Sequence, residues 1–282
     1  MNFYDLKKRF IVASFVLTCL FVLLVFSKWF VVKIAVMLVL LLLAGVGIWE
    51  YTEMRKKIGS RLPRTLLVIL TPLTTAAFFI PPFHAHITDP SLMMVCFSFF
   101  FIFLAHFRKI EESVQKIGES FLGLCYVSVP LGMIFRIFYP TSSSSHLQSG
   151  VFWLVYLIAV TKVTDVAAYF IGKMFGRRKL ALELSPNKTI EGTVAGVLSS
   201  SLLSGIFYFF FDKSFQFPFA LWLFLGLSLG VIGQIGDLAE SLIKRDSRVK
   251  DSNQLPGLGG VLDMLDSLLF ATPFFYFVMG YS

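Results

Sequence analysis

Charge is scarce in this sequence, and its scarcity defines the class of protein first. Asp, Glu, Lys and Arg make up 15% of the 282 residues, whereas apolar residues make up 56% and Phe alone occurs 33 times. Soluble domains carry about 25% charged residues. Together with a mean hydropathy of +0.78, this composition excludes a large water-soluble core and indicates a membrane protein.

Cysteine and the common catalytic signatures are also scarce or missing. The three cysteines, Cys19, Cys96 and Cys125, each lie in an apolar run and form no CxxC pair. Neither a disulfide framework nor a zinc site is therefore indicated. The sequence has no Walker A loop, no GxSxG and no HExxH, which removes three familiar enzyme classes. The four scattered histidines are interpreted as interfacial polar residues.

What the sequence has instead is a series of long apolar runs. Each is about long enough to cross a bilayer, which takes about 20 residues. Because the backbone must satisfy its own hydrogen bonds there, such runs favour helices over a barrel. We predict an all-α polytopic membrane protein with about nine transmembrane helices, and eight or ten remain open. The runs are 10–26, 29–49, 64–80, 91–107, 119–138, 149–171, 190–211, 218–241 and 258–280.

The basic residues predict the orientation of these helices. On the nine-span arrangement most of the 25 Lys and Arg fall on one face, with Lys28, Lys33, Arg136 and Lys213 on the other. The positive-inside rule then makes the N-terminus cytoplasmic. The net charge of +8 is explained by this topology and by anionic headgroups, so we expect no nucleic-acid partner. The basic start resembles a secretory signal, but an uncleaved first span is favoured.

Acidic residues divide the chain into two halves. Before residue 140 the spans hold almost no acids, since Asp89 is placed in an outer loop and the Glu residues are interpreted as surface groups. The polar run 141–150 is the best candidate boundary. We predict that 1–140 holds N-terminal membrane helices, about five spans. Residues 141–282 are predicted to form a C-terminal catalytic membrane domain of about four spans.

The sixth span carries the first polar cluster of the second half. Lys162, Asp165 and Tyr169 follow one another at i, i+3 and i+7, which places them on one helical face. An ion pair that locks helices together and the wall of a polar cavity both fit this spacing.

The second cluster lies ahead of the seventh span. Ser185 followed by Pro186 is typical of a helix N-cap with proline at the first helical position. The seventh helix would then begin there, with Lys188 in its first turn and Glu191 close behind. Free N–H groups beside a lysine form a ready anion site.

The third cluster, between 236 and 267, is the densest in charge. The eighth span ends in a polar stripe, and the last span begins with acids after a Gly-rich turn at 256–260 that allows close approach to a ligand. The stripe is Asp237, Glu240, Ser241 and Lys244; the last span presents Asp263, Asp266 and Ser267.

Carboxylates held together repel unless they are protonated or bridged by a cation. Mg²⁺ is typically shared between one or two carboxylates and substrate phosphates. Carboxylates, a metal ion and clustered cations favour phosphoryl or nucleotidyl transfer. A cation-coupled transporter remains the alternative of a different class, although its polar residues should reach both faces of the membrane.

Several ordered segments also resemble one enzyme family, the phosphatidate cytidylyltransferases (CDP-diacylglycerol synthases). The resemblance covers the second half in detail and the first half only in its many spans. Two positions depart from the family pattern, because Leu258 stands where His is usual and Met264 where Arg is usual. The segments are 165–169, 185–192, 236–241, 241–245, 250–251 and 255–267.

The resemblance implies a divergent but active enzyme that makes CDP-diacylglycerol and pyrophosphate from CTP and phosphatidic acid, with Mg²⁺ and room for a second cation. Asp237, Asp263 and Asp266 would be metal ligands and, with Lys244, catalytic groups. The implied substrate-binding residues are Ser185, Asn187, Lys188, Thr189, Glu191, Ser241, Arg245, Lys250, Asp251, Gly259, Gly260 and Asp165.

The expected location is the cell (inner) membrane, with the active site on the cytoplasmic side. The expected partners are CTP, phosphatidic acid and membrane lipid, and a homodimer is one open option. A CTP-dependent polyprenol or phytol kinase-like enzyme is the nearer alternative.

Overall fold

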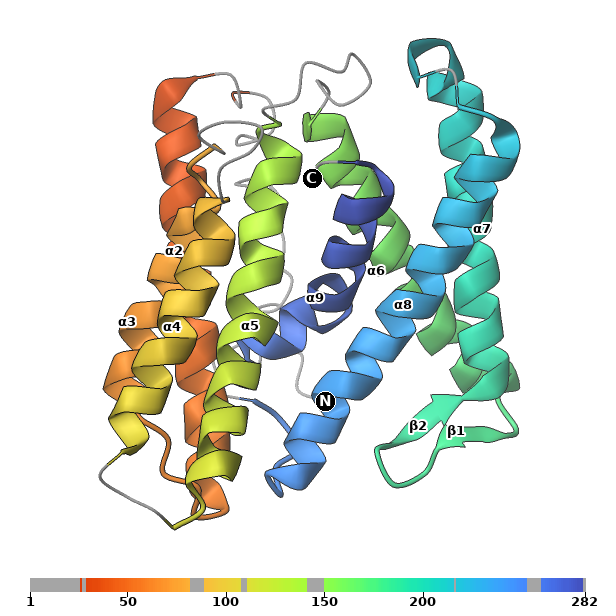
Figure 1. The fold of residues 1–282 in the computed structure, drawn as a ribbon. Helices are drawn as coiled ribbons and strands as arrows, with labels where there is room; N and C mark the ends of the chain where they lie inside the picture. Colours follow the sequence, from red (N-terminus) through yellow and green to blue (C-terminus); the bar gives the residue numbers. More distant parts are fainter. Residues whose placement is uncertain are drawn as a thin grey trace, which may run out of the picture. The chain divides into compact units, whose positions relative to one another are not determined.

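The computed structural model describes residues 26, 29–81, 89–107, 111–140, 150–215, 217–252 and 260–280. These residues form helices and one two-stranded sheet, so the prediction of an all-α membrane protein is confirmed (Figure 1). Within this part of the chain, six helices are long and apolar enough to cross a membrane. They are α2 (Phe30–Lys57), α5 (Ser113–Phe138), α6 (Gly150–Phe175), α7 (Ile190–Phe215), α8 (Phe219–Asp246) and α9 (Val261–Val278).

Two further apolar helices are shorter than the about 20 residues that a span takes. α3 (Arg64–Ala77) has 14 residues and α4 (Pro90–His106) has 17. At about 1.5 Å per residue these rise about 21 and 26 Å, against a hydrocarbon core of about 30 Å. The first predicted run, 10–26, lies outside the described residues except for Phe26. The count of nine spans stays a prediction.

The chain divides into two compact units. Unit 1 consists of Met1–Phe135 and Ser247–Met264, and unit 2 of Arg136–Asp246 and Leu265–Ser282. A short segment near the C-terminus thus belongs to the unit of the N-terminal helices. The assignment of catalysis to 141–282 stays a prediction.

In unit 1, α2 packs on α3, and α3 packs on α4. The cytoplasmic end predicted for α2 is held by Arg55, whose guanidinium donates to both carboxylate oxygens of Glu119 at 2.6 and 3.1 Å. Ser60 donates to the same carboxylate at 2.6 Å. The prediction that the Glu residues of this half are surface groups is wrong for Glu50, which is 0% exposed. Periodicity could not reveal this, because its partners lie more than 200 residues away.

In unit 2, α6, α7 and α8 pack tightly because glycines face the neighbouring backbones. A Cβ at Gly196 would come within 2.7 Å of the carbonyl oxygen of Thr164 on α6. A Cβ at Gly226 would come within 2.7 Å of the carbonyl oxygen of Ser200 on α7. Small residues at such contacts are typical of membrane helix packing. Trp153, stacked on Trp222 at 5.6 Å, fills the space between the helices.

An antiparallel hairpin precedes α7, made of β1 (Lys179–Ala181) and β2 (Ser185–Thr189). Figure 1 shows the hairpin at the N-terminal end of α7. The predicted N-cap at Ser185 is therefore wrong, and Lys188 lies on a strand instead of a first helical turn. The fixed φ of Pro186 suits an extended strand as well as a helix start. Thr189 is the residue that caps α7, since its Oγ1 accepts the N–H of Gly192 at 3.2 Å.

Candidate active site

A polar cavity of about 630 Å³ lies in unit 2, between α6, the hairpin and α8. Its walls combine three lysines, two carboxylates and several hydroxyl and amide groups, an unusual content for a membrane helix bundle. The predicted site residues that line it are Asp165, Ser185, Asn187, Lys188, Thr189 and Asp237. The structure thus brings together residues from three of the segments that the sequence singled out.

An ion pair joins the hairpin to α8 at this cavity. The ammonium of Lys188 lies 2.8 Å from a carboxylate oxygen of Asp237, and both side chains are mostly buried, 16% and 28% exposed. Lys188 also approaches the backbone oxygen of Gln234 at 3.5 Å. This lysine is close to an acid on the cavity wall, where an incoming anion could compete for it.

A second polar group, on α6, faces α9. The ammonium of Lys162 lies 3.4 Å from Asp165 and 3.2 Å from the hydroxyl of Ser267, which itself donates to Asp165 at 3.0 Å. The other carboxylate oxygen of Asp165, Oδ1, is buried and has no hydrogen-bond partner. The ion pair and the cavity wall, between which the sequence did not decide, are both present.

Asp165, Asp237 and Asp266 form a group of mutually repelling carboxylates in unit 2. Gly236 makes this proximity possible, because a Cβ there would come within 2.7 Å of the carbonyl oxygen of Asp266. No three His, Cys, Asp or Glu among the described residues are near enough to one another to hold a metal ion as the side chains stand. The donor chemistry nevertheless suits a hard cation, because Asp165 Oδ1 is a buried carboxylate oxygen without a hydrogen-bond partner.

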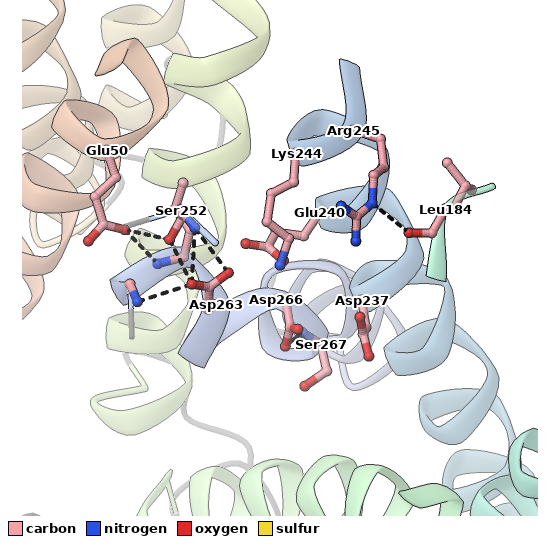
Figure 2. Close-up of polar contacts among 12 residues, drawn as sticks. Glu50, Leu184, Asp237, Glu240, Lys244, Arg245, Ser252, Asp263, Asp266 and Ser267 are labelled. Carbon is pink, nitrogen blue, oxygen red and sulfur yellow. Dashed lines mark hydrogen bonds and ion pairs between the residues drawn. The ribbon is translucent and has the colours of Figure 1, made fainter. Parts of the chain in front are cut away.

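Other predicted residues of unit 2 lie outside the cavity lining and hold its walls. Lys244 is paired with Glu240, one turn earlier on α8, and that carboxylate is 0% exposed. Arg245 donates to the backbone oxygen of Leu184 in the hairpin turn at 3.1 Å (Figure 2). Glu191 accepts the backbone N–H groups of residues 177 and 178 at 3.1 and 3.2 Å. The last two contacts fix both ends of the hairpin. Ser241, also predicted, is buried on α8.

Asp263 lies in unit 1 and is tied to the backbone around the start of α9. Its Oδ2 accepts the N–H of Ser252 at 3.1 Å and that of Gly260 at 3.0 Å. Figure 2 shows Glu50 and Ser252 joined to the same region. The predicted residues Lys250 and Asp251 line a separate hollow of about 620 Å³ in this unit.

Of the two positions that depart from the family pattern, the structure describes one. Leu258, like the predicted residue Gly259, lies outside the described residues. Met264 is 37% exposed on α9.

Sequence reasoning missed four polar residues of the cavity. Gln234 lies three residues before Asp237, so the helical periodicity of the stripe could have indicated it. Lys173 and Lys179 lie in the basic loop ahead of the second cluster but were not assigned to the site, and Thr193 gave no signal in a Ser/Thr-rich span. The missed residues are Gln234, Lys173, Lys179 and Thr193.

Comparison with known proteins agrees with the resemblance seen in the sequence. The profile of the Cytidylyltransferase family matches residues 7–282. The phosphatidate cytidylyltransferase of Chlamydia muridarum is 36% identical over 288 residues, covering 98% of this chain and 93% of the relative. That of Chlamydia pneumoniae is 34% identical and covers 96% and 91%. That of Bacillus subtilis is 40% identical over 173 residues, 61% of each chain.

Proposed function

This chain belongs to the cytidylyltransferase family, and from that premise we propose that it makes CDP-diacylglycerol and pyrophosphate from CTP and phosphatidic acid. Relatives that align over almost the whole chain carry the name phosphatidate cytidylyltransferase. The observation that carries the proposal is the cavity of unit 2, where Lys188 and Asp237 meet among hydroxyl and amide groups.

The proposed reaction is a displacement at the α-phosphorus of CTP. An oxygen of the phosphatidate phosphate forms the new P–O bond, the bond between the α-phosphorus and the bridging oxygen breaks, and pyrophosphate leaves with the bonding electrons. A phosphate monoester has a second pKa of about 6. The nucleophile is therefore already mostly a dianion at neutral pH, and no protein base is required.

The lysines of the cavity supply the charge that a triphosphate requires. Lys173, Lys179 and Lys188 line its wall, and the hydroxyl of Ser185 and the amide of Asn187 can donate to phosphate oxygens. Neutralising the leaving pyrophosphate is the main electrostatic task in such transfers. The remaining predicted contacts, from Ser241, Lys244, Arg245, Lys250, Asp251, Gly259 and Gly260, stay part of the proposal.

A divalent cation, with Mg²⁺ as the proposed ion, fits the acidic side of the site. Asp237 and Asp266 would hold it, with Asp165 beside them. The ion would neutralise phosphate charge when bound. Asp263 as a further ligand stays a prediction, because its carboxylate accepts hydrogen bonds from Ser252 and Gly260 in this structure. A second cation also stays a prediction.

The protein is a membrane protein, and we propose the cell (inner) membrane with the cavity on the cytoplasmic side. Basic residues support that side, since Lys173, Lys179 and Lys188 all surround the cavity. Phosphatidic acid would arrive from the bilayer and CTP from the cytoplasm. A homodimer stays a prediction.

Membranes that contain the protein should be tested with phosphatidic acid and CTP carrying label in either the α- or the γ-phosphate. Cytidylyl transfer moves only the α label into lipid and requires a divalent cation. Incorporation of the γ label would instead identify a CTP-dependent lipid kinase. Membranes from cells without the protein give the background, and the absence of both labels from lipid would reject the proposal.

A further inference from the structure

The start of α9 has a cap that its own sequence does not supply. A helix leaves its first N–H groups without intrahelical acceptors, and a side chain just before the helix usually accepts one. Here that position is Gly260, which has no side chain. Asp263 accepts the N–H of Gly260 at 3.0 Å, so the N–H groups of Val261 and Leu262 need another acceptor.

Glu50, in the last third of α2, is that acceptor. Its Oε1 accepts the N–H of Val261 and its Oε2 accepts the N–H of Leu262, both at 3.0 Å. Both carboxylate oxygens are thus used on consecutive amides of one helical turn. The two elements are more than 200 residues apart in sequence, so this is a tertiary cap.

Burial makes this arrangement more than a surface contact. Glu50 is 0% exposed, and an ionised group at such a site is costly unless it is paired or fully hydrogen-bonded. The positive end of the α9 dipole and the two amides provide that compensation. The buried carboxylate of Glu50 is therefore stabilised by the start of α9.

Ser252 extends the cap to the segment that follows α8. Its hydroxyl lies 3.1 Å from Glu50 and 3.1 Å from Asp263, and its N–H donates to Asp263. Glu50 and Asp263 therefore hold one serine and one helical turn between them. The position of the turn depends on both carboxylates.

We propose that Glu50 is a positioning residue for the acidic groups of the active site, an inference that rests on the proposed function. By fixing the first turn of α9, it sets the position of Asp263, and Asp266 follows one turn further along the same helix. Errors of about 1 Å in the placement of reacting groups can cost about 100-fold in rate. Glu50 itself touches neither substrate nor the reacting atoms.

The test compares Glu50→Gln with Glu53→Gln in the full-length protein. The first change keeps the shape but replaces one acceptor oxygen with an NH₂ group that cannot accept a backbone N–H. The control removes a half-exposed charge one turn away, which pairs with Arg64. We expect Glu50→Gln to lower kcat about 10- to 100-fold and to raise the Mg²⁺ concentration for half-maximal activity, as loss of an outer positioning partner does. The KM for CTP of Glu50→Gln should change less than about 3-fold. The kcat and KM of the control, Glu53→Gln, should also stay within about 3-fold of wild type.

Amide hydrogen exchange supplies a readout that does not depend on turnover. The amides of Val261 and Leu262 should exchange faster in Glu50→Gln, while those of α3 keep their protection. If exchange accelerates but kcat and the Mg²⁺ dependence match wild type, the cap is only structural and the proposal is overturned. Unchanged exchange at both amides overturns it as well.

Two further arms keep the test decisive. If Glu50→Gln does not fold, Ser252→Ala serves in its place, because it removes only one hydroxyl of the same cluster. It should lower kcat and raise the Mg²⁺ concentration for half-maximal activity, both by less than Glu50→Gln. Wild-type kcat and Mg²⁺ dependence in Ser252→Ala would reject the inference. If the wild-type protein forms no labelled lipid, the proposed function fails. In that case amide hydrogen exchange still tests the role of Glu50. Mg²⁺ should slow the exchange of α9 amides in the wild type but not in Glu50→Gln.

Discussion

Two polar clusters in this apolar chain differ in what their carboxylates already hold. In unit 1, both oxygens of Glu50 accept backbone N–H groups at the start of α9. In unit 2, Asp165 Oδ1 and Gln234 Oε1 are buried without hydrogen-bond partners and belong to residues that line the cavity. Buried polar atoms are normally satisfied. The first cluster is therefore satisfied by the protein's own backbone, whereas the second keeps two buried oxygens that a ligand of the proposed function would satisfy.

The largest expected effect comes from neutralising an acid of the open cluster. Asp237→Asn keeps the size of the side chain and removes the charge, so kcat/KM should fall about 1,000-fold, the equivalent of several kcal/mol of electrostatic stabilisation. The midpoint of thermal unfolding should change less than the activity, because the amide oxygen of Asn can still accept a hydrogen bond from Lys188. Steady-state kinetics and a melting curve measure both. Glu183→Gln, an exposed acid in the hairpin turn, is the matched control. Activity of Asp237→Asn near the control value would remove Asp237 from the site.

Replacing Lys188, the lysine paired with Asp237, should have the next largest effect. Lys188→Ala should raise the KM for CTP about 10- to 100-fold, because a charge-assisted hydrogen bond to a phosphate contributes about 1.5–3 kcal/mol. Arg177→Ala removes an exposed cation nearby that does not line the cavity, and it should leave KM near wild type. Titrations with CTP measure the KM of both variants in parallel. An equal rise of KM in both would mean that general positive charge, and not Lys188, attracts CTP.

A pair of glycine variants tests how closely α8 and α9 must approach in unit 2. A methyl group at Gly236 would press on the carbonyl oxygen of Asp266, so Gly236→Ala should lower stability by about 1–3 kcal/mol and reduce activity. Gly118→Ala on α5 meets nothing within 4 Å and should raise stability by about 0.5–1 kcal/mol. Unfolding monitored in detergent gives both values. Wild-type stability and activity of Gly236→Ala would show that the close approach of α8 and α9 at this position is not required.

Ser267→Ala is expected to have the smallest effect. The hydroxyl donates to Asp165 and accepts from Lys162, so its loss should cost about 1 kcal/mol of stability and lower activity only a few-fold. Ser199→Ala, half-buried on α7, is the control. A loss as large as that of Asp237→Asn would instead assign Ser267 a direct part in the reaction.

The residues differ in how far the sequence could predict them. Asp165, Lys188 and Asp237 were found from helical spacing and motif order, because charges in apolar runs are rare enough to stand out. Lys188 was nevertheless given the wrong element, since a Ser-Pro pair suits a helix start and a strand equally well. Glu50 was misjudged for a different reason: one carboxylate in a long apolar run gives no indication of a partner that arrives from the far end of the chain.

The sequence by itself determined the membrane class, the helical class and the family, because hydropathy and ordered motifs are local properties of the chain. Its charge asymmetry predicts the orientation. Only the tertiary structure decided which carboxylates are already satisfied and which remain available. That distinction depends on hydrogen bonds between residues far apart in sequence, such as Glu50 with Val261 and Lys188 with Asp237. Spacing along one helix shows which side chains share a face, but the element packed against that face decides what they bind.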